Sequence, residues 1–251
     1  GVFWTHSDSG NPPLLFAITR TGELLATYRV QGAVNLDWEA IETDDDGRLY
    51  LCDVGNNLPG LPLKTRWIDI VREPNPRSLP KNPTRTDNNP ADAVELPLIE
   101  IERQLHFTFP DQPQDVEGVV CWKDTLLLFS KVHQGTAPVF ALPLTSEKAV
   151  KPPRSVPLKP LGDGVSSLRI TGAALTPKRD RLALCSYDYV RVFELSGENF
   201  TDDKALGHLD RCPNRVMRFA ATQTEGCEWD GDNLILVSED RQIFEIPCPR
   251  K

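Results

Sequence analysis

The sequence predicts an all-β protein, a β-propeller of about five four-stranded blades. One plan, a polar strand followed by a turn and an apolar strand, recurs along the chain at a spacing of roughly 50 residues, as propeller blades require. The 22 prolines and 16 glycines are spread along the 251 residues, which favours many short strands joined by turns. No long helical periodicity competes with this pattern.

The repeat is clearest in four pairs of strands. Each pair starts with a polar strand that contains a small residue, expected to line the central channel: Asp37–Ile41, Asp115–Val119, Ile170–Ala174 and Gln223–Cys227. Each continues with an apolar strand: Arg48–Asp53, Thr125–Ser130, Arg181–Ser186 and Asn233–Ser238. A β-sandwich with irregular hairpins is the alternative, but it gives no reason for the same residues to recur in register.

Further apolar segments complete the blades. The third strands are Arg66–Val71, Val139–Leu142, Val190–Leu195 and Gln242–Ile246, and the outer strands are Ile99–Phe109, Ser155–Leu158 and Arg215–Phe219. The opening segments Val2–Ser7, Leu14–Ile18 and Leu25–Val30 supply the later strands of one more blade. The first blade is therefore incomplete at its N-terminal side, and we expect residues upstream of Gly1 to be missing.

The chain is expected to form a single domain, 1–251, with blades at about 1–33, 34–112, 113–165, 166–220 and 221–251. The proline-rich stretch Glu73–Pro90 is expected to be an irregular surface insertion. Helix-like composition is confined to the short stretch Ala91–Glu95.

Charge and cysteine content limit the function classes. The net charge is -8 and the pI about 5.1, which excludes a nucleic-acid-binding surface and permits cation binding. No apolar run reaches the roughly 18 residues of a membrane span. The six cysteines include no CxxC pair, so zinc has no support. Cys52 and Cys185 are expected to be buried thiols, and Cys212–Cys227 is the favoured disulfide.

The candidate metal ligands are carboxylates of the inner strands. Glu39, Glu117 and Glu225 are aligned by the repeat and should converge around the axis, with Asp37 and Asp115 two residues earlier on the same faces. Such a group needs a cation, a shared proton or a nearby Arg or Lys. Hard oxygen ligands would suit calcium or magnesium. An equally weighted alternative is that each glutamate clasps the backbone of the neighbouring blade.

The candidate catalytic residues are His6 and Asp8. They stand two residues apart on a predicted strand and thus share a face, as an acid–base couple would. The alternative is structural, because Asp8-Ser-Gly-Asn11 is a turn sequence.

Taken together, these motifs resemble those of a group of exported bacterial β-propeller proteins, most of them uncharacterised. The family patterns W-x-H-N-D-S-G-N, D-W-E-D-I and L-Y-x-G-D-I-G-D-N match Trp4–Asn11, Asp37–Ile41 and Leu49–Asn57. Asp115–Gly118 and Ile170–Ala174 match two further patterns. The resemblance implies a propeller, a secreted or periplasmic location, and the absence here of an inner strand ahead of Trp4. A looser similarity links the channel to six-bladed gluconolactonase–paraoxonase propellers, in which Glu, Asn and Asp hold calcium.

These observations favour an extracytoplasmic, monomeric propeller that binds a small molecule, a metal ion or a protein partner through its acidic channel. The alternative is a metal-dependent hydrolase of a small ester, lactone or phosphate that uses the same carboxylates with His6. A third candidate is an interaction module that presents the Glu73–Pro90 insertion. Fold alone does not choose among them.

Overall fold

The computed structural model describes residues 1–57, 63–78, 96–135, 137–144, 154–158, 169–195, 212–220 and 223–249. Within these ranges the chain forms β-strands and a single short 3-10 helix, Pro76–Ser78, so the all-β prediction is confirmed. No helix among the described residues is long and apolar enough to cross a membrane. Most of the Glu73–Pro90 insertion, and all of Ala91–Glu95, lie outside the described residues.

Each strand predicted from the sequence overlaps a strand of the structure. The first half of the chain contains β1 (Phe3–His6), β2 (Leu14–Ile18), β3 (Leu24–Gln31), β4 (Trp38–Thr43), β5 (Arg48–Asp53), β6 (Thr65–Arg72), β7 (Leu98–Thr108), β8 (Val116–Trp122) and β9 (Thr125–Ser130). The second half contains β10 (Ala137–Pro143), β11 (Arg154–Leu158), β12 (Gly172–Leu175), β13 (Arg181–Cys185), β14 (Tyr189–Glu194), β15 (Asn214–Arg218), β16 (Thr224–Asp230), β17 (Asn233–Ser238) and β18 (Ile243–Pro247).

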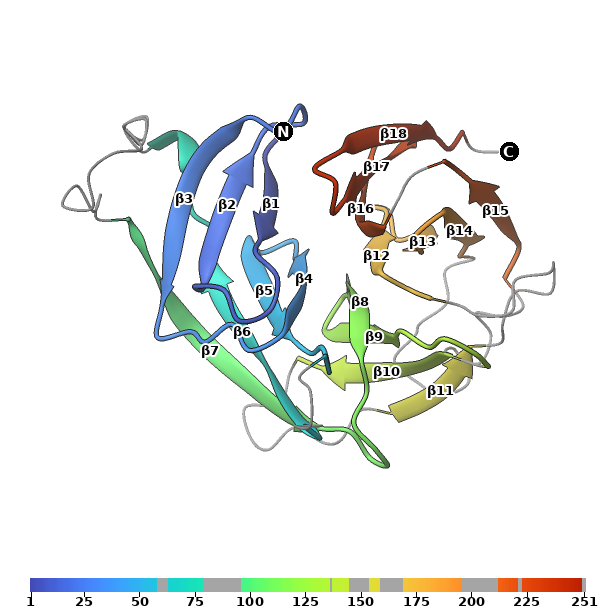
Figure 1. Ribbon diagram of the computed structural model, residues 1–251, viewed down its shortest axis with the longest axis horizontal. Helices are drawn as coiled ribbons and strands as arrows, with labels where there is room; N and C mark the ends of the chain where they lie inside the picture. Colours follow the sequence, from blue (N-terminus) through green and yellow to red (C-terminus); the bar gives the residue numbers. More distant parts are fainter. Residues whose placement is uncertain are drawn as a thin grey trace.

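Consecutive strands pair antiparallel and form sheets arranged about a common centre, as in a β-propeller (Figure 1). β8–β11 and β12–β15 are four-stranded sheets, and β16–β18 form a three-stranded sheet. β1–β3 and β4–β7 are two antiparallel meanders that join into one seven-stranded sheet. The junction is a parallel pairing of β3 with β7, from Arg29 opposite Leu98 to Gln31 opposite Glu100, which the repeat did not predict.

The burial of the strands follows their sequences. Every residue of β8 and β9 is buried, as expected for near-continuous apolar runs covered on both faces. β7 alternates between exposed and less exposed residues along most of its length, which is the period of a strand with one solvated face. In the turn before β5, Asp44 Oδ1 accepts hydrogen bonds from the amides of Asp46 and Arg48, and Gly47 has a φ of 73°. The Asp44–Gly47 segment is thus the hairpin turn that joins β4 to β5.

The first strands β4, β8, β12 and β16 pack side by side around the centre (Figure 1). Their small residues permit this close approach. A Cβ on Gly118 of β8 would lie 3.0 Å from the Ala173 Cβ of β12, and a Cβ on Gly172 would lie 3.1 Å from the Gly226 Cα of β16. The Thr171 hydroxyl, just before β12, also donates a 2.5 Å hydrogen bond to the Thr224 carbonyl of β16.

Apolar side chains fill the spaces between neighbouring sheets. Phe129 of β9 and Phe193 of β14 are buried in one such cluster. Across the two ends of the chain, Arg20 of the β2–β3 turn contacts Asp230 and Glu245, each at 2.6 Å.

The cysteines correct one prediction. All six are free thiols, so the Cys212–Cys227 disulfide is wrong. The two residues pack in different apolar clusters, and Cys227 faces the buried thiol of Cys185 instead. Cys52 and Cys185 are fully buried, as expected for thiols in apolar strands.

Candidate functional site

The three glutamates aligned by the repeat share one structural feature, a β-bulge on the first strand of their sheet. The pairing register shifts at Trp38/Ala40, Val116/Gly118 and Thr224/Gly226. Glu39, Glu117 and Glu225 are the extra residues at these shifts. A bulge leaves its extra residue outside the regular pairing and redirects its side chain. The three glutamates therefore occupy the same kind of backbone position. In contrast, β12 has no glutamate and pairs with β13 without a register shift.

The loop after β5, residues 54–57, holds the carboxylates of two sheets. Its Asn57 amide donates to Asp37 Oδ2 at 2.7 Å, and the Asn57 side chain donates to Glu39 Oε1 at 3.1 Å. Its Asn56 amide donates to Asp115 Oδ1 at 2.9 Å. One oxygen of each carboxylate is thereby anchored by the same short loop, which fixes their relative positions.

Gly55 lets two of these carboxylates lie against the loop backbone. A Cβ at this position would lie 2.7 Å from both Asp37 Cγ and Asp37 Oδ2 and would also overlap Glu39 Oε1. The loop thus forms a cradle for acidic side chains.

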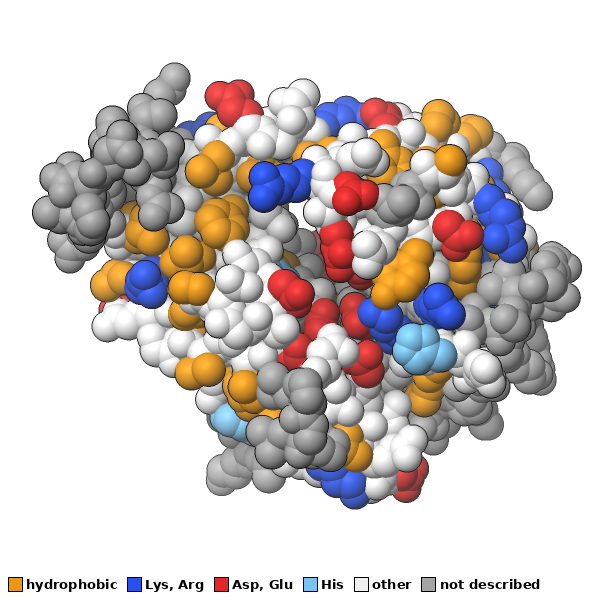
Figure 2. Space-filling view, viewed as in Figure 1, with side chains coloured by type: hydrophobic (Ala, Val, Ile, Leu, Met, Phe, Trp, Pro, Cys, Tyr) orange, Lys and Arg blue, Asp and Glu red, His pale blue; other side chains and the backbone are white. Residues whose placement is uncertain are grey.

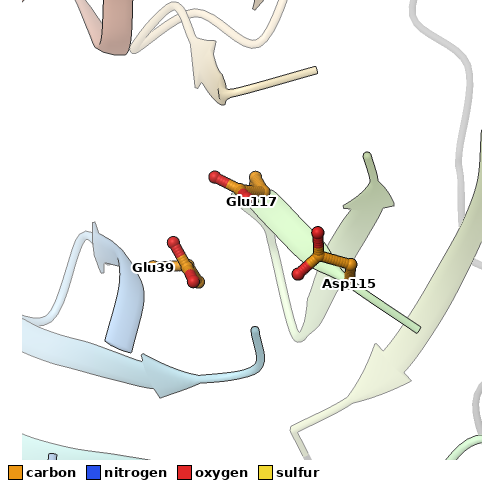
Figure 3. Close-up of side chains that lie close together, drawn as sticks. All are labelled: Glu39, Asp115 and Glu117. Carbon is orange, nitrogen blue, oxygen red and sulfur yellow. The ribbon is translucent and has the colours of Figure 1, made fainter. Parts of the chain in front are cut away.

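Glu39, Asp115 and Glu117 come closest together. One carboxylate oxygen from each lies within 4.8 Å of the other two. Figure 3 shows Glu39 on β4 across from Asp115 and Glu117, which come from β8 and the residue before it, with the three carboxylates around a common space. Glu117 is 5% exposed, and the other two are half-buried. Three of the five predicted metal ligands are thus brought into one group.

The other two predicted ligands lie near this group rather than within it. Asp37 is fully buried, and its Oδ1 has no hydrogen-bond partner among the described residues. Glu225 of β16 is close enough for its pKa to be raised to about 8, first by burial and then by the charge of Glu117. Acidic side chains gather around the hollow at the centre of the molecule (Figure 2).

The environment of the group opposes its ionisation. Burial, followed by the charges of Glu117 and Asp37, raises the pKa of Glu39 to about 11. Burial also raises the pKa values of Asp115 and Glu117. A shared proton or a bound cation would relieve this repulsion.

Lys131 and Arg66 are the cations packed against these carboxylates. Lys131 Nζ lies 2.8 Å from Glu117 Oε1 and 5.3 Å from the centre of the Tyr187 ring. Burial lowers the pKa of Lys131, but the charge of Glu117 and the hydrogen bonds to Glu117 and Tyr187 together outweigh burial and raise the pKa above its ordinary value. Arg66 is fully buried, and its guanidinium lies 3.8 Å from Asp37 Oδ2 and 3.5 Å from Asp53 Oδ1.

The donor set fits a hard divalent cation. Calcium takes oxygen ligands at about 2.3–2.6 Å, so ligands on opposite sides of the ion are about 5 Å apart. The oxygens of Glu39, Asp115 and Glu117 span no more than 4.8 Å, and Asp37 Oδ1 adds a buried oxygen without a partner. Magnesium needs a tighter octahedral shell at about 2.0–2.1 Å. The upper limit of 4.8 Å is compatible with the oxygen shell of either ion.

His6 and Asp8 are not among the three grouped carboxylates, although the charge of Asp8 contributes to the raised pKa values of Glu39 and Glu225. The Nδ1 atom of His6 is 2.9 Å from the Ser7 carbonyl oxygen, and its ring packs edge-on against Trp38 at 5.6 Å. Burial lowers the pKa of His6. Asp8 Oδ1 accepts a hydrogen bond from the Ser9 amide. These contacts match the structural alternative for the segment.

Sequence reasoning missed Arg66 and the cradle loop. Arg66 begins the predicted strand Arg66–Val71, in which Asp69 is the only other charged residue, and a cation in such a strand was a usable signal for a buried acidic partner. The role of the loop depends on residues 59 positions apart, Asn56 and Asp115, so no local pattern could indicate it.

No family model and no curated protein matches the sequence. Among solved structures, the chain is similar to a nidogen/laminin complex (TM-score 0.47, 8% identity, 94% of this chain and 72% of that chain). It is similar to the β-propeller domain of Myceliophteria thermophila Cps50 (Swd1), with a TM-score of 0.46 and 9% identity over 98% of this chain and 67% of that chain. It is also similar to the periplasmic gluconolactonase PpgL of Pseudomonas aeruginosa, with a TM-score of 0.46 and 10% identity over 98% of this chain and 66% of that chain. The chain thus spans between 66% and 72% of the length of these three structures.

Proposed function

We propose that the chain is an extracytoplasmic propeller of five units, 1–33, 34–112, 113–165, 166–220 and 221–251, whose acidic centre binds calcium. Glu39, Asp115 and Glu117 would be the ligands, with Asp37 and Glu225 close enough to join. The observation that carries this proposal is the convergence of three carboxylates, from β4 and β8, within 4.8 Å of one another. The exported location is supported by the family resemblance of the sequence motifs.

The local charge balance supports a cation rather than a purely structural clasp. Lys131 contacts Glu117, and the guanidinium of Arg66 is directed to Asp37 and Asp53. Glu39 and Asp115 receive hydrogen bonds from the loop after β5. Neutral amide donors supply no counter-charge to either carboxylate, so a cation that replaces their protons would be stabilised among them.

A hydrolase is supported less well. Its expected base, His6, is directed to the Ser7 carbonyl and the Trp38 ring. Binding without catalysis needs only the carboxylates.

The test is calcium binding by isothermal titration calorimetry, together with thermal unfolding in calcium or in EDTA. Calcium at 100 times its dissociation constant should stabilise the fold by about 2.7 kcal/mol. For a domain of this size that corresponds to a rise of about 5–10 °C in Tm. Glu39→Gln and Glu117→Gln should abolish the heat of binding and the rise in Tm.

Glu100→Gln is the matched control, because Glu100 is an exposed glutamate on β7. It should bind calcium like the unmodified protein. If EDTA leaves Tm unchanged while Glu39→Gln still lowers it, the glutamates clasp neighbouring sheets and bind no metal. That result would overturn the proposal.

A further inference from the structure

Two cysteine thiols from neighbouring sheets face each other. Cys185 ends β13 and Cys227 lies on β16, and both belong to the apolar cluster between the β12–β15 sheet and the β16–β18 sheet. β13 and β16 are in contact although they belong to different sheets. The Cys227 thiol is hydrogen-bonded to the Cys185 thiol. The two sulfur atoms are therefore neighbours in the packed core.

Gly172 of β12 lets the Cys185 sulfur approach β16. Gly172 lies opposite Cys185 in the pairing of β12 with β13. A Cβ on Gly172 would lie 2.8 Å from Cys185 Sγ and 3.1 Å from the Gly226 Cα of β16. The Cys185 sulfur thus occupies the space that a larger side chain would fill, beside the residue that precedes Cys227. The Thr171 hydroxyl lies 3.8 Å from the same sulfur.

Other cysteines of the chain have different neighbours. Cys248 Sγ lies 3.7 Å from Met217 Sδ, and Cys121 Sγ donates to the Lys123 carbonyl at 3.4 Å. Cys212 packs in the apolar cluster on the opposite face of the β12–β15 sheet. The packing therefore favours the pairing of Cys185 with Cys227.

We propose that Cys185 and Cys227 form a disulfide bond when the chain folds in the presence of a disulfide oxidant, and that this bond joins β13 to β16. The reaction is thiol–disulfide exchange. The Cys227 thiolate attacks one sulfur of the oxidant and releases a thiolate, and the Cys185 thiolate then attacks the Cys227 sulfur and releases a second one. Two protein thiols lose two protons and two electrons, and the oxidant is reduced to two thiols.

The bond is expected to form while the two sheets are still assembling. Cys185 is fully buried once they have packed, so an oxidant cannot reach it in the folded chain. During assembly both thiols are accessible, and the packing of β16 against β12 and β13 then brings them together. Oxidation should therefore be fast during refolding and slow in the folded protein.

The bond would hold the three-stranded sheet β16–β18 against its four-stranded neighbour. Cys185 and Cys227 stand 42 positions apart, and closing a loop of this length restricts the unfolded chain. The inference goes beyond the calcium proposal, because no carboxylate takes part in the reaction.

The experiment refolds the whole chain from urea in EDTA, either with a mixture of oxidised and reduced glutathione or with dithiothreitol. After refolding in glutathione, proteolysis and mass spectrometry should identify two peptides linked through Cys185 and Cys227. The linked form should have a Tm about 5–10 °C above that of the reduced form. Protein that is first folded in dithiothreitol and then moved to the glutathione mixture should form the bond at least tenfold more slowly.

Cys185→Ala and Cys227→Ala should each abolish the difference in Tm between the two buffers. Cys248→Ala is the matched control and should keep that difference, because Cys248 is buried in the same cluster but contacts Met217. The peptide map of the unmodified chain does not depend on whether any variant folds.

Three results would overturn the proposal: pairing between other cysteines, Cys185 and Cys227 that stay free or carry glutathione, or a linked form no more stable than the reduced one. Equally fast oxidation of the folded protein would contradict bond formation during assembly. The test contains EDTA throughout, so failure of calcium binding would leave its result standing.

Discussion

Replacing Gly55 by alanine tests whether the loop after β5 holds the acidic centre in place. The added Cβ would lie 2.7 Å from Asp37 Cγ, against an ordinary carbon–carbon contact of about 3.5–4.0 Å. Asp37 cannot move aside freely, because it is fully buried and anchored by the Asn57 amide. The substitution therefore overpacks a fixed side chain.

Two opposing effects determine the size of the change. Overpacking costs about 1–3 kcal/mol. The φ of Gly55 lies outside the left-handed region, so alanine restricts the unfolded chain and stabilises the fold by about 0.4–1 kcal/mol. The net loss should be about 1–2 kcal/mol, which corresponds to a fall of about 2–8 °C in Tm.

The assay is thermal unfolding of Gly55→Ala in EDTA, followed by calcium titration. Glu39 Oε1 also overlaps the added Cβ, so Gly55→Ala/Glu39→Ala should lose less stability than the sum of the single variants. Calcium binding by Gly55→Ala should weaken at least tenfold, because the added Cβ displaces the carboxylates of Asp37 and Glu39. A variant that is as stable as the unmodified protein and binds calcium equally well would refute the reasoning.

Three further predictions concern contacts outside the cradle. Burial raises the pKa of Glu228 to about 7 from its ordinary 4.5, so the folded state holds the proton more tightly than the unfolded state. The free energy of unfolding should therefore fall as pH rises from about 4.5 to 7. Glu228→Gln should flatten this slope in urea titrations across that range. Arg181 is fully buried and donates to the Cys248 carbonyl at 2.6 Å. Arg181→Ala leaves that carbonyl without its donor and should lower the free energy of unfolding by about 1–3 kcal/mol. A neutral result in urea titrations would contradict this role. Thr171→Val removes the hydroxyl that donates to the Thr224 carbonyl and should lower the free energy of unfolding, measured by chemical denaturation, by about 1–2 kcal/mol. An unchanged free energy would show that this hydrogen bond contributes nothing to stability.

The repeat made most of the fold predictable. Segments such as Thr125–Ser130 and Asn233–Ser238 are apolar, short and bounded by turns, so their sequence alone indicates buried strands. The parallel pairing of β3 with β7 was not predictable, because it joins segments of different repeats and depends on how two sheets meet in space. The Cys212–Cys227 disulfide failed for the same reason, since closeness in sequence says little about which apolar cluster a cysteine enters.

The site was predictable in its residue types but not in its geometry. Alignment of the repeats identified Glu39 and Glu117, and both stand at the same kind of bulge. The bulge itself has no clear signature in one sequence. Asp115 joins the group because the Asn56 amide holds it from another sheet, and Glu225 lies farther away although its local sequence matches. Local pattern thus predicts which residues face the centre, and long-range hydrogen bonds decide which of them meet.

The parallel contact between β3 and β7 has a consequence for solubility. β7 is 11 residues long, and as an outer strand it would otherwise present a long row of unpaired backbone groups to other chains. Pairing with β3 covers the start of that row, from Leu98 to Glu100, where the exposed Leu98 side chain would favour edge-to-edge aggregation. Farther along, β7 carries the charged residues Glu102 and Arg103, which discourage the addition of another strand. The parallel pairing with β3 therefore covers the part of β7 that lacks charged gatekeepers other than Glu100, in the longest strand of the described residues.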